Sequence, residues 1–163
     1  MPQVFISYSR KDLDFVIRLT ADLTKAKFNV WYDLSGIRGG ARWQREIKIA
    51  LEDSQFVIVV LSPDSVASDW VEKECLYASQ LKRKIVPLMY RRCDVPLGVV
   101  NVNYIDVQGE NYERNYKEIL KGLSVDDATI ASLPKPTRSS RASAYILWIG
   151  GLPILPGVFL TLR

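Results

Sequence analysis

Apolar residues in the first 124 positions follow two different periods. Short apolar runs indicate strands, and apolar residues that recur every three or four positions indicate amphipathic helices. The runs predict strands at 4–6, 28–32, 56–61, 85–90 and 102–107. The recurring positions predict helices at about 12–27, 43–51, 65–83 and 112–123. This alternation of strands and helices is typical of an α/β fold.

The strand at 56–61 indicates what kind of sheet to expect. All six of its residues are apolar, which is the pattern of a strand buried on both faces of a parallel sheet. Five such strands commonly adopt the flavodoxin-like order 2-1-3-4-5, whose ligand crevice opens at the carboxyl ends of strands 1 and 3. The loops at 7–11 and 62–69 should therefore border the site, and the glycine-containing loop at 33–42 can reach over them.

The amino-acid composition excludes several classes of enzyme and binding site. The chain has no histidine, which excludes Ser-His-Asp and Cys-His hydrolases and HExxH zinc proteases. Its two cysteines, Cys75 and Cys93, are too few for a zinc site made of four thiolates, and no metal site or bound cofactor is expected. The net charge of +4 is spread along the chain, so nucleic acid is not an expected partner. The phosphate-binding motifs GxGxxG and GxxxxGK[ST] are absent.

Three segments in the expected order resemble the motifs of one family. They are Val4-Phe5-Ile6-Ser7-Tyr8-Ser9-Arg10-Lys11-Asp12, the loop from Asp33 through Gly40 to Trp43, and Ile58–Pro63 followed by Ser68–Glu74. Together they resemble the Toll/interleukin-1 receptor (TIR) domain, over residues 3–123. The second segment resembles the loop that this family calls the BB loop.

The resemblance implies a reaction and an alternative to it. Many bacterial and plant TIR domains cleave NAD+ to nicotinamide and ADP-ribose or a cyclic form, after self-association, in immune or stress signalling. Their catalytic glutamate lies on the helix after strand 3, often in a WxxxE pattern, which Trp70 and Glu74 match. NAD+ would be the substrate, and other TIR domains would be partners. The alternatives are a non-catalytic assembly or adaptor module, and a bacterial effector that imitates host adaptors.

The chemistry of NAD+ cleavage suits a chain without histidine. Nicotinamide leaves as a neutral molecule, so it needs no general acid, and a fixed carboxylate can stabilise the oxocarbenium-like ribose. Positions 70 and 74 share one helix face at the crevice mouth, whereas Glu72 lies about 200° around the helix from Trp70. Glu74 is therefore the candidate, and the alternative is a surface carboxylate beside a core tryptophan.

Trp70 and five further residues are candidates for binding the substrate. Tyr8, Ser9 and Arg10 lie at the expected crevice, where an arginine can bind phosphate and a tyrosine can stack on a base. Arg38 and Trp43 belong to the glycine-containing loop and the helix after it. Each has a structural alternative. The first three residues could form a loop whose helix begins at a capping Asp12, Arg38 could be solvated, and Trp43 could anchor the core.

The end of the chain differs from the rest. The 21 residues at 142–162 carry no charge, and a helix of that length reaches about 30 Å, the thickness of a bilayer core. This predicts three parts, which are a TIR domain at 1–124, a linker at 125–141 and an apolar transmembrane helix at 142–162. Pro153 and Pro156 oppose a regular helix. Basic residues precede the apolar segment, so the TIR domain is expected to be membrane-anchored and to face the cytoplasm.

Overall fold

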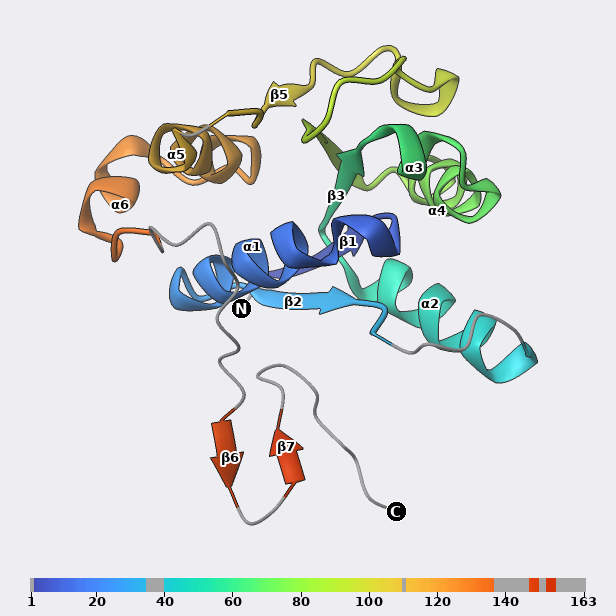
Figure 1. Ribbon diagram of the computed structural model, residues 1–163, viewed down its shortest axis with the longest axis horizontal. Coiled ribbons are helices and arrows are strands. Elements are labelled where there is room, and N and C mark those ends of the chain that lie inside the picture. The colour runs from blue at the N-terminus through green and yellow to red at the C-terminus, as the bar shows by residue number, and fades with distance from the viewer. Residues whose placement is uncertain (1, 35–39, 110, 137–146, 150–151, 155–163) are drawn as a thin grey trace.

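The protein contains a five-stranded parallel sheet with helices on both faces (Figure 1). The structure is a computed structural model, and it describes residues 2–34, 40–109, 111–136, 147–149 and 152–154. The strand order is β2-β1-β3-β4-β5, which confirms the predicted winding. The strands are β1 (Gln3–Ser7), β2 (Asn29–Tyr32), β3 (Phe56–Leu61), β4 (Lys84–Met89) and β5 (Ile105–Asp106).

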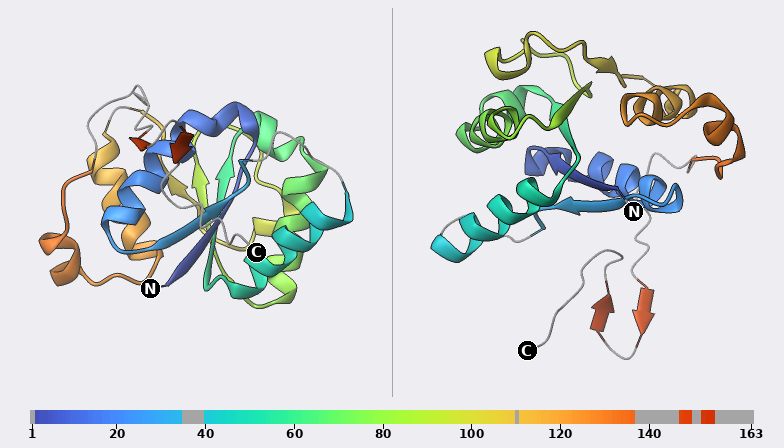
Figure 2. Two further views of the ribbon diagram at one scale, coloured as in Figure 1. Left: turned by 90° about the horizontal axis from the view of Figure 1, so that it is seen from below. Right: turned by 180° about the vertical axis from the view of Figure 1, so that it is seen from behind.

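The helices form one layer on each side of the sheet (Figure 2). Helices α1 and α5 cover one face, and α2 and α4 cover the other. The helical elements are η1 (Arg10–Asp12), α1 (Leu13–Lys25), α2 (Ala41–Asp53), α3 (Pro63–Val66), α4 (Asp69–Gln80), η2 (Leu97–Val99), α5 (Tyr112–Gly122) and α6 (Asp127–Ser132).

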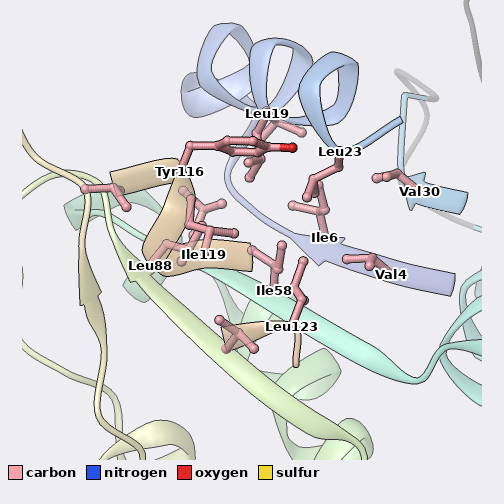
Figure 3. Packing of buried hydrophobic residues seen from close by; sticks show 14 of the residues in the cluster. Val4, Ile6, Leu19, Leu23, Val30, Ile58, Leu88, Tyr116, Ile119 and Leu123 are labelled. Carbon is pink, nitrogen blue, oxygen red and sulfur yellow. The ribbon is translucent and has the colours of Figure 1, made fainter. Parts of the chain in front are cut away.

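Side-chain alternation along β1 supplies both cores. Val4 and Ile6 point toward α1 and α5, where they join Leu19 and Ile119 (Figure 3). Phe5 points the other way, toward α2 and α4. Successive strand residues face opposite sides of a sheet, so Ser7 belongs to the face of Phe5. The last residue of β1 is thereby directed toward α4.

Three helices end in the same way, with a residue other than glycine in the left-handed conformation after the C-cap. Lys27, Lys82 and Ser124 have φ angles of 67°, 53° and 64° and follow α1, α4 and α5. At each end, the two backbone N–H groups that follow the C-cap bond back to the last helical turn, which is the Schellman arrangement. These helix ends turn the chain toward β2, β4 and α6 within a few residues.

Two segments differ from their predicted extents. β5 was expected at 102–107, but only Ile105 and Asp106 pair with β4. The stretch expected to be a linker, 125–141, contains α6, whose N-cap Asp126 accepts a hydrogen bond from the Thr129 backbone N–H at 2.8 Å. Ile130 and Leu133 pack against the α1/α5 core. The packed body therefore continues past residue 124.

The apolar segment at 142–162 is not a single helix where the structure describes it. β6 (Leu147–Ile149) and β7 (Leu152–Ile154) pair in antiparallel fashion, so the predicted apolar helix is wrong for these residues. Pro153 lacks the N–H that a helix interior requires. The remainder of 142–162 lies outside the described residues. Among the described residues, no helix has the length and apolar character to cross a membrane.

Candidate active site

Glu74 is the carboxylate that the fold brings to the end of β1. It lies in α4, whose apolar stripe of Val71, Cys75 and Ala78 packs on the sheet. Glu74 is 7% exposed, so it lies deeper than the crevice mouth where the sequence places it. Glu72, two residues earlier, is exposed. Burial beside Glu74 and Glu72 also raises the pKa of the Cys75 thiol to about 12, with desolvation as the largest cause. Cys75 is therefore a neutral core residue.

Ser7 is the direct partner of Glu74. Its Oγ donates a hydrogen bond to Glu74 Oε2 at 2.5 Å, and its residue is 1% exposed. The sequence pattern points to the next three residues and does not single out Ser7. A signal was available, because Ser7 is a polar residue at the carboxyl end of an inner strand, where an apolar side chain is the usual choice. Its acceptor, 67 positions away, could not be identified from spacing.

Tyr8 and Arg10 lie on the other side of Glu74 and share a partner. The Tyr8 hydroxyl donates to the backbone carbonyl of Asp33 at 2.7 Å, and Arg10 forms an ion pair with the Asp33 carboxylate at 3.1 Å. The Tyr8 ring is buried in the α1/α5 core and contacts Tyr32 edge to face. Ser9 precedes η1, and its side chain makes no capping bond. The two loops after β1 and β2 are thus joined at the crevice.

A narrow cleft lies at this corner of the sheet. Its lining residues are Ile6, Tyr8, Arg10, Asp33, Trp70 and Glu74. The structure therefore brings together four of the candidates from the sequence, namely Tyr8, Arg10, Trp70 and Glu74. Ser9 is adjacent in the chain but does not line the cleft. Arg38 lies outside the described residues.

Trp43 packs against Trp70, which lines the cleft. Its ring centroid lies 4.4 Å from that of Trp70, with the planes tilted by 34°. Trp43 is buried in the α2/α4 core, so the structure favours its role as an anchor. It does not line the cleft. The contact holds α2 against α4 and fixes the indole of Trp70 beside Glu74.

A second cavity lies between α2 and α4. It is a groove of about 200 Å³ that shares Trp70 and Glu74 with the first cavity. Ile47 and Leu51 make part of its wall apolar, and Lys48 and Lys73 add positive charge. Lys73 Nζ lies 5.5 Å from the Trp70 ring centroid. Glu74 and Trp70 therefore border both the cleft and the groove.

A buried polar network holds the neighbouring loops. Asp12 accepts hydrogen bonds from Ser62 Oγ at 2.6 Å and from Arg91 at 2.7 Å. Arg91 also binds Asp64, which accepts from Lys11. These hydrogen bonds, that of Lys11 first and that of Arg91 second, lower the pKa of Asp64. Asp12 was considered as a helix cap, but its side chain makes no capping bond. It joins the loops after β1, β3 and β4 instead.

These features define an α/β domain with a buried carboxylate at the carboxyl edge of its sheet. The profile of the TIR domain matches residues 4–120, and the chain belongs to the TIR domain family.

Similar proteins include two bacterial enzymes. The chain is 36% identical over 93 residues to the NAD(+) hydrolase PdTIR of Paracoccus denitrificans, a match that covers 54% of the chain and 31% of the relative. It is 34% identical over 71 residues to the 2′ cyclic ADP-D-ribose synthase BtTIR of Bacteroides thetaiotaomicron, covering 43% of the chain and 25% of the relative. The chain thus spans less than a third of the length of either relative.

A solved structure resembles the whole body of the chain. The TIR domain of the Toll-related receptor TRR-2 from Hydra magnipapillata has a TM-score of 0.60 and 26% identity, and the match covers 74% of this chain and 94% of that one. The Clostridium botulinum CMP N-glycosidase BcmB, with a TM-score of 0.52 and 13% identity, shares the fold alone. That match covers 73% of this chain and 98% of that one.

Proposed function

We propose that this chain cleaves the bond between ribose and nicotinamide in NAD+, as a glycohydrolase or as an ADP-ribosyl cyclase. The observation that carries the proposal is Glu74, a buried carboxylate that is held by Ser7 and lines two cavities beside Trp70. The printed names of the bacterial relatives, an NAD(+) hydrolase and a cyclic ADP-ribose synthase, support the same reaction.

The geometry suggests how each residue contributes. As the glycosidic bond breaks, its electron pair goes to the nicotinamide nitrogen and positive charge develops on the ribose. A desolvated carboxylate next to that charge stabilises the transition state more than the ground state. Trp70 offers an aromatic surface for a ring, and Arg10 can exchange Asp33 for a phosphate. Water then captures the ribose to give ADP-ribose, or the adenosine part of the same molecule captures it to give a cyclic product.

The direct test is product analysis. Purified chain is incubated with NAD+, and the mixture is separated by chromatography at successive times. Nicotinamide should accumulate together with ADP-ribose or a cyclic isomer, in amounts equal to the NAD+ consumed. If NAD+ stays intact at every protein concentration, the chain is not this enzyme. The non-catalytic assembly module would then be the better proposal, and the likeness to a receptor TIR domain favours that alternative.

Self-association with other TIR domains is the second part of the proposal. The cleft near Glu74 carries one arginine, whereas NAD+ has two phosphates and two riboses to hold. A second copy that brings its BB loop, 33–42, to the site would supply the missing groups.

Specific activity should therefore rise with protein concentration. We expect nicotinamide release per molecule to increase on concentrating the chain or on adding a crowding agent, because the local concentration of partners rises. Ile37→Asp in the BB loop should suppress that increase and leave the circular dichroism spectrum unchanged. Activity per molecule that is constant from dilute solution upward would show that one copy suffices.

Membrane attachment through 142–162, with the TIR domain in the cytoplasm, is the third part of the proposal. It rests on the sequence, since these 21 residues carry no charge. The full chain should float with liposomes in a density gradient and resist extraction by high salt, because apolar burial is not screened by ions. A chain that ends after Pro136 should stay at the bottom of the gradient. If the two chains behave alike in the gradient, the segment 142–162 does not attach the protein to membranes.

A further inference from the structure

We propose that Ser7 is a positioning residue for Glu74, and that its hydroxyl keeps the carboxylate aimed into the two cavities. The inference rests on the proposed function, because it assigns Ser7 to the same reaction. It concerns a residue that touches Glu74 and does not line either cavity.

The placement of Ser7 makes it a fixed donor. It is the last residue of β1, and β1 pairs with β2 on one side and with β3 on the other. The register places Ser7 opposite Val59, a fully buried residue of β3. Ser7 is paired with β3 and the preceding residue, Ile6, with β2, so the backbone here cannot follow the side chain of Glu74 if that side chain moves. The Ser7 hydroxyl is thus a donor at a fixed position, and the Glu74 carboxylate accepts its hydrogen bond.

The hydrogen bond joins two groups that are shielded from water. Ser7 is 1% exposed and Glu74 is 7% exposed, and the Oγ to Oε2 distance is 2.5 Å. A buried carboxylate that loses a donor is less stable in its ionised form, and hydrogen bonds to charged groups are the stronger ones. Glutamate also has three side-chain torsions, so binding Oε2 at one position limits the directions that Oε1 can take. The short hydrogen bond therefore holds the carboxylate of Glu74 at one place.

The first experiment compares Ser7→Ala with wild type in steady-state NAD+ cleavage. We expect the kcat for nicotinamide release to fall about 10- to 100-fold, the factor that corresponds to one charge-assisted hydrogen bond. KM should change by less than about 3-fold, because Ser7 does not contact the cavities where the substrate would bind. Ser7→Thr, which restores a hydroxyl at the same position, should recover most of the lost kcat.

Ser54→Ala is the matched control. Ser54 is also a fully buried serine with one hydroxyl bond, to the Ala50 carbonyl at 2.6 Å. It follows α2 and precedes β3, so it lies at the amino edge of the sheet, away from Glu74. We expect it to lower the thermal midpoint without lowering kcat. If Ser7→Ala keeps the wild-type kcat, or if Ser54→Ala lowers kcat as much, Ser7 has no positioning role. Should Ser7→Thr fail to fold, the separate effects on kcat and KM in Ser7→Ala decide.

The second experiment needs no substrate. Urea denaturation of Ser7→Ala, Glu74→Gln and the double variant forms a cycle that reports whether the two side chains act on each other. We expect the double variant to be more stable than the sum of the single losses predicts. Ser7→Ala alone leaves a buried carboxylate without this hydrogen bond, and the double variant no longer contains that carboxylate. If wild type releases no nicotinamide, the proposed function fails, and this cycle still tests the coupling. Additive losses would overturn the inference even in an active enzyme.

Discussion

Glu74→Gln is expected to lower nicotinamide release by about 100- to 1,000-fold, the loss typical of removing a group that stabilises transition-state charge. Glutamine keeps the shape of the side chain and an oxygen that Ser7 can donate to, but it removes the negative charge. The expected result is therefore loss of kcat with an intact fold. Steady-state product analysis measures the rate, and circular dichroism checks the fold.

Glu72→Gln is the control for that substitution. Glu72 lies two residues earlier on the same helix, and it is exposed and lines neither cavity. We expect it to keep most of the wild-type activity. A Glu74→Gln protein with full activity, or equal losses in both variants, would show that Glu74 is not the catalytic carboxylate.

The sheet could be predicted because each strand carries its own signal. An apolar run such as Phe56–Leu61 indicates burial on both faces by itself, and the structure shows its residues from Val57 to Leu61 fully buried. Helical spacing likewise separated Glu74 from Glu72, since the two positions face different directions on any regular helix. These inferences depend only on residues that are close to one another in the sequence.

Pairs of polar residues from distant segments could not be predicted. Ser7 and Glu74 are 67 positions apart, and Asp12 and Arg91 are 79 apart. Each residue alone has an ordinary local explanation, as a strand end, a helix start or a solvated charge. Only the parallel winding brings them together, because it gathers the carboxyl ends of β1, β3 and β4 at one edge. The unexpected pairing of β6 with β7 has a similar cause, since two short strands become favourable only by pairing with each other.

The Asp12–Arg91 pair should be the most sensitive polar contact for stability. The Asp12 side chain is completely buried, and its partners are Arg91 and Ser62. Removing the guanidinium leaves a buried carboxylate with one neutral donor, and breaking a buried ion pair in this way typically costs 3–5 kcal/mol. Because the Arg91 side chain is 42% exposed, part of that cost is screened by water. We expect Arg91→Met to lower the free energy of unfolding by about 3 kcal/mol.

A double variant separates this explanation from a simple loss of packing. Asp12→Asn removes the charge that Arg91→Met leaves unpaired, so the two together should cost less than the sum of the single changes. Arg92→Met is the matched control, because Arg92 is the exposed neighbour of Arg91 in the same loop, and it should change the free energy of unfolding by less than about 0.5 kcal/mol. Equilibrium urea denaturation measures all four variants. Strictly additive losses, or a loss in Arg92→Met as large as in Arg91→Met, would show that the buried charge of Asp12 is not what the network neutralises.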